Sequence, residues 1–127
     1  MGTVWAELDR VIDGLSQMGD IDAAAVVRRD GFIIVHTLPN GVDPKVVAAM
    51  TASIVGISEM ATEQLSQGLF LQAIIESESG KLVSTGAGEM ALLVALVHRD
   101  ANLGLVLFAM ERAARSVDEV LRRSEGR

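Results

Sequence analysis

Apolar residues recur at helical spacing along the first segment of the chain, residues 3–18. A large apolar side chain occupies every third or fourth position, and charged side chains fall between these positions. This spacing predicts an amphipathic helix with one buried side, preceded by Thr3 as its N-cap. The apolar positions are Val4, Leu8, Val11, Leu15 and Met18.

Two short apolar runs, residues 23–29 and 32–37, lie on either side of Asp30-Gly31. An Asp-Gly pair readily supplies the positive φ angles that a tight hairpin turn requires. The two runs therefore predict a pair of antiparallel strands.

A second helix is predicted from Pro44 to about Ser66, with Asp43 as its cap. No charged residue occurs between Lys45 and Glu59, so this helix lacks a polar side over most of its length. Its larger apolar residues form a stripe that we expect to lie on the sheet: Val46, Met50, Ile54, Ile57, Ala61 and Leu65. Small residues form a neighbouring side, which would let a second backbone approach closely: Ala48, Ala49, Ala52, Ser53 and Gly56.

The remainder of the chain predicts three more strands and a last helix. Residues 69–85 read as a strand, a turn at Ser79-Gly80 and a strand, and residues 91–97 form an almost unbroken apolar run. From about Leu103 an apolar stripe alternates with charged positions, which predicts an amphipathic helix. The order is helix, two strands, helix, three strands, helix, within one domain over residues 1–127. Paired hairpins favour an α+β sandwich on an antiparallel sheet, because a parallel sheet would alternate helices with single strands.

Composition narrows the classes of partner. The chain has no cysteine and a net charge of −6. The lack of cysteine excludes disulfides and thiolate chemistry, and the acidic balance opposes binding to nucleic acid or to an anionic membrane surface. The uncharged stretch 46–58 is also shorter than the roughly 18 to 20 apolar residues that a bilayer requires. We therefore expect a cytoplasmic protein that binds neither nucleic acid nor a membrane.

One motif could hold a nucleotide. Gly86, Gly88 and Ala91 match the spacing of a dinucleotide-binding loop, G-x-G-x-x-G/A. Such a loop must follow a buried strand and open a helix, whereas here a half-polar strand precedes it and an apolar run follows. We interpret the glycines as a turn between two antiparallel strands. A small nucleotide-binding or enzymatic domain that uses this turn is the alternative.

No group of side chains makes a persuasive catalytic or metal site. His36 and His98 each lie at the end of a predicted strand without a ligand cluster beside them. Ser84 with His98 and Asp100 could form a hydrolytic triad, but the G-x-S-x-G turn that exposes such a serine is missing. The sequence thus predicts a protein that is not an enzyme and has no catalytic residue, cofactor or metal.

The order of elements and several stretches together resemble the roadblock (dynein light chain) family, in the single-domain form of its bacterial and archaeal members. The resemblance covers nearly the whole chain and rests on the leading helix, on "VVRRDGFIIV" at 26–35 and on the small-residue helix at 44–66. It rests above all on "GKLVSTGAGEMALLVALVHRDANLGLVLFAMERAARSV" at 80–117.

The resemblance implies a five-stranded antiparallel sheet with the central helix on one face and the terminal helices on the other. It also implies a dimer through residues 44–66 and 69–76, higher assembly with other roadblock-like chains, and a platform for a small Ras-like GTPase whose hydrolysis of GTP some members stimulate. A purely structural assembly subunit is a further alternative. The expected dimer interface comprises Ala48, Ala49, Ala52, Ser53, Gly56, Met60, Phe70, Gln72 and Ile74. Exposed basic residues that could contact the partner are Arg28, Arg29, Arg112 and Arg115.

Overall fold

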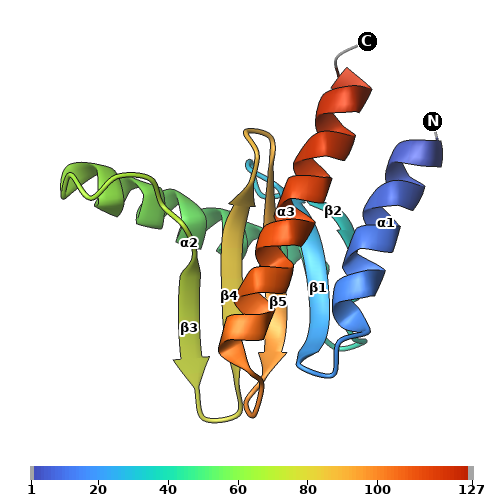
Figure 1. Cartoon of the computed structure of the whole chain (residues 1–127), viewed down its shortest axis with the longest axis horizontal. Helices are drawn as coiled ribbons and strands as arrows, with labels where there is room; N and C mark the ends of the chain where they lie inside the picture. The colour runs from blue at the N-terminus through green and yellow to red at the C-terminus, as the bar shows by residue number, and fades with distance from the viewer. Residues whose placement is uncertain (1, 126–127) are drawn as a thin grey trace.

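The computed structural model describes residues 2–125, which form three helices and one five-stranded sheet (Figure 1). In chain order the elements are α1 (Gly2–Ser16), β1 (Ile21–Arg28), β2 (Ile33–His36), α2 (Pro44–Gln64), β3 (Ala73–Ser77), β4 (Gly80–Ala87), β5 (Ala91–His98) and α3 (Leu103–Glu125). The strands lie in the order β2-β1-β5-β4-β3, and every neighbouring pair is antiparallel. The predicted order of elements and the antiparallel sheet are confirmed.

The sheet separates two helical layers. α1 packs on β1 and β2, α3 packs on β4 and β5, and α1 and α3 contact each other on this face. α2 contacts the sheet from the other side, and its C-terminal half projects beyond β3 (Figure 1). The expectation that the central helix and the terminal helices lie on opposite faces is therefore confirmed.

The central strand β5 and its neighbour β1 are buried on both faces. Ala24 and Val26 of β1 belong to the core under α1 and α3, whereas Ala23, Ala25 and Val27 belong to the core under α2. A strand covered on both faces has no need of alternating polar residues, which explains the unbroken apolar run of β5. Its buried side chains face the two cores in turn.

Turn chemistry sets where the strands end. Gly31, in the predicted Asp-Gly turn, has a φ of +92°, and Gly88, between β4 and β5, has a φ of +83°. Side chains are strained in this left-handed region and glycine is not, so both glycines stand where the chain must reverse. The interpretation of this segment as a turn between antiparallel strands is confirmed for Gly88, whereas Gly86 pairs with Leu92 inside the ladder, one residue before β4 ends.

One predicted strand is shorter than expected. The apolar segment 69–72 was expected to belong to the strand after α2, but ladder pairing begins only at Ala73, opposite Ser84. The preceding residues run free of the sheet, and Thr85 Oγ1 donates a hydrogen bond to the carbonyl oxygen of Leu71 at 2.8 Å. The hydrophobicity of the segment could not reveal this, because apolar residues occur both inside and outside strand ladders.

Candidate interaction site

Helix α2 exposes more large apolar residues than either of the other two helices, over the residues that the structure describes. Asp43 caps the helix by accepting a hydrogen bond from the amide of Lys45 at 2.9 Å, and Pro44 fills the first position. From there the helix runs for 21 residues, of which only Val47, Ala48, Thr51 and Val55 are buried. After Val55 the helix has no buried residue and exposes Ile57 (67% exposed) and Met60 (64%), followed by the C-cap residue Leu65 (66%).

The structure corrects the predicted orientation of α2. The stripe of larger apolar residues was expected to lie on the sheet, but Val46, Met50, Ile57 and Leu65 are exposed. The buried face comprises Val47, Ala48, Thr51 and Val55 instead, so that of the small-residue side Ala48 is buried and Ala49, Ser53 and Gly56 are exposed. A Cβ built on Gly31 in the β1–β2 turn would lie 3.7 Å from the Cα of Ala49, which shows how closely the two backbones approach. Small side chains permit this contact, and the bulkier stripe is thereby turned outward.

This orientation removes one residue from the expected dimer interface. Ala48 is 0% exposed and packs in the core beneath α2, so its side chain cannot contact a second chain. The other α2 positions of the set remain on the surface at least in part: Ala49, Ala52, Ser53, Gly56 and Met60. Large exposed residues of α2 that the expected set omitted, Ile57 above all, adjoin them. The apolar stripe that contains Ile57 was recognised in the sequence, but it was expected to pack on the sheet.

Strand β3 lies at one edge of the sheet and is open along it. Its only strand neighbour among the described residues is β4, and four of its five residues are exposed. An edge strand presents unpaired amide and carbonyl groups that can pair with another strand. Of the expected interface residues here, Gln72 and Ile74 are exposed, whereas Phe70 is half-buried and packs toward the core beneath α2.

Among the described helices, only α2 is long and apolar enough, by length and composition, to cross a membrane. The same composition suits a helix that another chain covers. The ion pair between Glu59 and Arg29, together with the buried Val47 and Val55, joins the helix to the rest of the protein.

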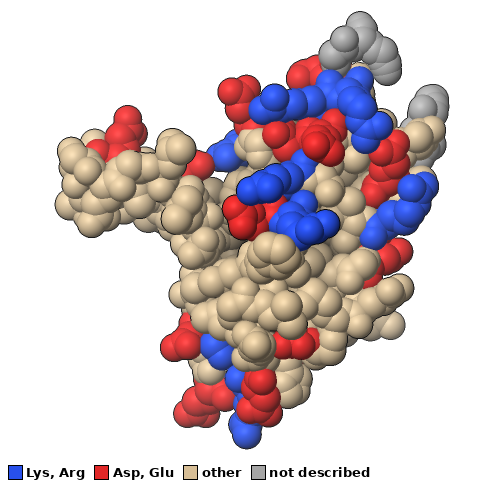
Figure 2. All heavy atoms as spheres, viewed as in Figure 1, with Lys and Arg blue, Asp and Glu red and all other residues tan. Residues whose placement is uncertain are grey.

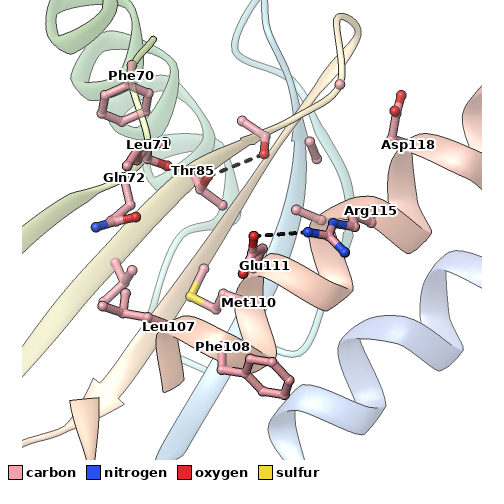
Figure 3. A pocket seen from close by; sticks show the side chains of 15 residues that line it. Phe70, Leu71, Gln72, Thr85, Leu107, Phe108, Met110, Glu111, Arg115 and Asp118 are labelled. Carbon is pink, nitrogen blue, oxygen red and sulfur yellow. Dashed lines mark hydrogen bonds and ion pairs between the residues drawn. The ribbon is translucent and has the colours of Figure 1, made fainter. Parts of the chain in front are cut away.

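A groove of about 600 Å³ lies on the opposite face of the sheet, between α3 on one side and strand β4 with the segment 70–72 on the other. Figure 3 shows the side chains of Phe70, Leu71 and Gln72 on one side of it and those of Leu107, Phe108 and Glu111 on the other. Arg115 of α3 also lines this groove and forms an ion pair with Glu111 at 3.1 Å. Its walls are therefore mostly apolar, with charged groups along α3.

A second depression of about 480 Å³ lies where the N-terminal half of α1 meets the β1–β2 and β4–β5 turns. Arg28 and Arg29 line it, beside Trp5 and Met90. The four predicted basic residues thus belong to two surfaces. Arg28 and Arg29 lie at this depression, whereas Arg112 and Arg115 lie on α3, where the guanidinium of Arg112 stacks over the ring of Phe108 at 5.8 Å.

Arg29 joins three parts of the fold. Its Nη1 donates to both carboxylate oxygens of Glu59 in α2, at 3.0 and 3.2 Å, and its Nη2 donates to the carbonyl oxygen of Gly88 at 3.2 Å. These bonds tie α2 to the turn between β4 and β5. Hydrogen bonds from a charged guanidinium are stronger than those between neutral groups. Sequence reasoning placed Arg29 on the surface and missed this partner, which is 30 positions away in the chain.

The Gly86–Gly88 turn lacks the features of a nucleotide site. Strand β5 follows it rather than a helix, so no helix N-terminus faces the glycines. The Asp118 carboxylate lies over Gly88 so closely that a Cβ built on Gly88 would overlap it. A carboxylate in that position opposes the approach of a phosphate.

The other candidates for chemistry are dispersed. Ser84 is fully buried and pairs with Val94, whereas His98 pairs with Gly80 at the far end of β4, so they do not form a triad. The Nδ1 atoms of His36 and His98 accept hydrogen bonds from backbone amides, at 3.0 and 3.2 Å respectively. Within residues 2–125, no group of three or more His, Asp or Glu side chains could hold a metal ion.

The fold and these surfaces can be compared with known proteins. The sequence profile of the Roadblock/LC7 domain matches residues 7–97. The chain belongs to the Roadblock/LC7 family. The roadblock chain is 36% identical over 110 residues to the uncharacterized protein MJ1340 of Methanocaldococcus jannaschii, a match that covers 87% of this chain and 96% of that protein. The predicted family resemblance is thereby confirmed.

Solved structures share the roadblock fold. The gliding protein MglB of Thermus thermophilus superposes with a TM-score of 0.85 at 22% identity, covering 94% of this chain and 92% of that one. A Roadblock/LC7 domain from Streptomyces avermitilis gives a TM-score of 0.83 at 22% identity, covering 89% of this chain and 96% of that one. At this level of identity the likeness concerns the fold.

Proposed function

We propose that this roadblock chain forms a symmetric dimer through α2 and β3, and that the dimer is a non-enzymatic regulator or scaffold for a small Ras-like GTPase in the cytoplasm. The observation that carries the proposal is the exposed apolar face of α2 beside the open edge of β3. Family membership adds the kind of partner, because the roadblock resemblance implies a small GTPase.

The projecting half of α2 supports self-association. Soluble monomers seldom expose large contiguous apolar surfaces, and here Ile57, Met60 and Leu65 are exposed on a segment that extends past the sheet (Figures 1 and 2). A two-fold axis beside β3 would pair the β3 strands of two protomers. It would also place each projecting helix end against the other protomer. A second copy of the chain placed beside β3 would thus cover both the projecting end of α2 and the open edge of β3.

The arginines support a regulator that acts by binding. Arg28 is paired with Asp30 at 2.6 Å, Arg29 with Glu59 and Arg115 with Glu111, and Arg112 stacks on Phe108. An arginine that stabilises transferred phosphate must leave its partners to reach the nucleotide. We therefore propose that any effect on GTP hydrolysis arises through the GTPase's own switch segments, to which a partner can bind with different affinity in the two nucleotide states.

The dimer is tested by light scattering coupled to size exclusion. At tens of micromolar the wild-type chain should have twice the 13.5 kDa mass of one chain. Ile57→Glu would place two charges in the interface and should raise the dissociation constant by more than about 100-fold, that is by about 3 kcal/mol. Leu105→Glu, at an exposed apolar position of α3, is the matched control and should remain dimeric. A monomeric wild-type chain would contradict the proposal.

The partner is tested by immobilising the dimer and passing over it small GTPases from the same organism, loaded with GDP or with a non-hydrolysable GTP analogue. Preferential binding of one form supports a regulator that senses the nucleotide. Equal binding of both forms supports a scaffold and contradicts nucleotide sensing. If the dimer forms but binds no small GTPase, the chain is a purely structural subunit.

A further inference from the structure

Arg29 makes the polar contact that lies furthest along α2. The last buried residue of the helix is Val55, and Glu59 lies four residues later, about 6 Å further along the helix axis. Arg29, which directly follows β1, reaches both carboxylate oxygens of Glu59 with its Nη1, at 3.0 and 3.2 Å. In the part of the chain that the structure describes, no other ion pair or side-chain hydrogen bond joins α2 to the strands, to their turns or to another helix.

Arg29 is itself fixed to the turn between β4 and β5. Its Nη2 donates to the carbonyl oxygen of Gly88 at 3.2 Å, and its backbone amide donates to the carbonyl oxygen of Met90 at 3.3 Å. On the same turn, the Asp118 carboxylate of α3 packs against Gly88 and pairs with Arg122 at 3.1 Å. Arg29 therefore fastens α2 to a turn that α3 holds in place.

The guanidinium of Arg29 keeps this position although one of its nitrogens is unsatisfied. Its Nε is buried and has no hydrogen-bond partner among the described residues. A buried donor without a partner is unfavourable, so the contacts of the two Nη nitrogens must hold the group there. The side chains of Arg29 and Glu59 are 34% and 39% exposed, so the pair is partly shielded from the water and salt that weaken ion pairs on an open surface.

We propose that Arg29 is a positioning residue, which holds the C-terminal half of α2 in the orientation that a second protomer binds (Figure 1). This inference rests on the dimer proposed above. Arg29 acts through Glu59 and does not touch the second chain.

The symmetry of the dimer amplifies the effect of this tether. Both α2 helices must have the competent orientation at once, so the apparent dissociation constant varies as the inverse square of the competent fraction. If the helix end without its tether is competent about a third of the time, the constant rises about ninefold.

The orientation of α2 is tested first, in the Ile57→Glu background and at a concentration where light scattering finds single chains. Because the sequence has no cysteine, Ala61→Cys on α2 and Asp13→Cys on α1, both at exposed positions, carry two spin labels and no others. Electron paramagnetic resonance should give a narrow distribution of label distances with Arg29 in place. Arg29→Met and Glu59→Ala should each broaden it. A distribution that stays equally narrow in both variants would overturn the proposal.

The dissociation constant of the dimer is measured next, with Ile57 restored and the labels absent. Arg29→Met should raise it about tenfold, and Glu59→Ala by a similar factor. The double variant should be at most about threefold weaker than either single variant, because both changes remove the same contact. Arg29→Lys should fall between wild type and Arg29→Met, since an ammonium keeps the charge but lacks the planar fork that bonds Glu59 and Gly88 together.

Arg123→Met is the matched control. Arg123 of α3 pairs with Glu7 of α1 at 2.9 Å, so it also joins two helices that are far apart in the chain, but away from α2. This variant should have the label distances and the dissociation constant of the wild type. A loss for Arg29→Met no larger than that for Arg123→Met, or fully additive losses for Arg29→Met and Glu59→Ala, would contradict the positioning role.

Light scattering on the wild-type chain separates this inference from the proposed dimer. If the wild-type chain is monomeric, both fall. If it is dimeric and Arg29→Met leaves its dissociation constant unchanged, only the positioning role of Arg29 is rejected.

Discussion

The two helical layers of this protein differ in how fully one chain can complete them. α3, with 23 residues, contributes buried side chains from Val106 through Val120, close to its last turn, and packs against α1. α2 is nearly as long, with 21 residues, but none of its side chains is buried after Val55. The α1/α3 layer is therefore closed within the protomer, whereas the α2 layer is open at one end.

The difference shows that burial, rather than helical propensity or length, distinguishes the two layers. Both helices are apolar along one side, but only α3 has sheet and a neighbouring helix beneath most of its length. The open end of α2 lies over the same edge where β3 lacks a neighbour. The incomplete layer and the open edge of the sheet at one place are the two features on which the proposed dimer rests.

The largest effect is expected in the closed layer. Ile12→Ala removes a fully buried side chain of α1 and should lower the free energy of unfolding by about 2 to 5 kcal/mol, because it leaves a cavity as well as losing apolar contact. Its dimer dissociation constant should not change. Ile57→Ala in the open layer should have the opposite effect. It should raise the dissociation constant of the dimer and change the free energy of unfolding of the dilute monomer by less than about 0.5 kcal/mol. Urea denaturation and light scattering measure the two quantities.

Gly88→Ala should destabilise the closed layer by about 1 to 3 kcal/mol. The residue has a φ of +83°, and its new Cβ would displace the Asp118 carboxylate of α3. The matched control is Gly14→Ala in α1, where a Cβ meets open space and alanine should stabilise the helix by up to about 1 kcal/mol. Thermal unfolding of the two variants should therefore shift in opposite directions; equal shifts would show that the turn does not constrain α3.

Amide hydrogen exchange should distinguish the layers directly. In the Ile57→Glu variant, the protection factors of amides in the C-terminal half of α2 and in β3 should fall at least about tenfold, or about 1.4 kcal/mol. The reason is that the second protomer no longer covers these segments. Amides of α1 and α3 should retain theirs. Uniform loss across both layers would mean that dimerisation supports the whole fold rather than its open side.

The smallest effect is expected at the start of α2. Asp43→Ala removes the cap that accepts the Lys45 amide and should cost about 1 kcal/mol, since that amide loses its partner. Asn40→Ala, at an exposed position of the same loop, is the control and should be nearly neutral. Chemical denaturation of both variants at one protein concentration makes the comparison. A cost at Asp43 no larger than at Asn40 would show that the cap is dispensable.

Local patterns in the sequence predicted most of the elements. The Asp30-Gly31 turn, the Asp43-Pro44 start of the second helix and the stripe of the last helix were all placed close to where the structure has them. Each depends on residues near one another in the chain, through turn conformation, capping or helical periodicity. The strand at residues 69–72 was wrong because ladder pairing is a contact with β4, which composition does not encode.

The candidate surfaces could be predicted only in part. The sequence showed that α2 has more apolar surface than one sheet can cover, which led to the expectation of a partner. It could not show that Arg29 holds Glu59 and the Gly88 carbonyl, or that Phe108 and Leu71 face one another across a groove. Those contacts join residues that are far apart in the chain.

What the sequence by itself determined is the set of elements, their order and the presence of two apolar sides on the second helix. The tertiary structure decided which residues of the helix are buried against the body of the protein: Val47, Ala48, Thr51 and Val55, of which only Ala48 belongs to either predicted side. Helical periodicity assigns residues to faces around the helix axis but does not rank two apolar faces against each other. The small side chains of Ala48 and Ala49 allow α2 to approach the sheet and the Gly31 turn, and this close packing leaves Ile57 and its larger neighbours on the surface.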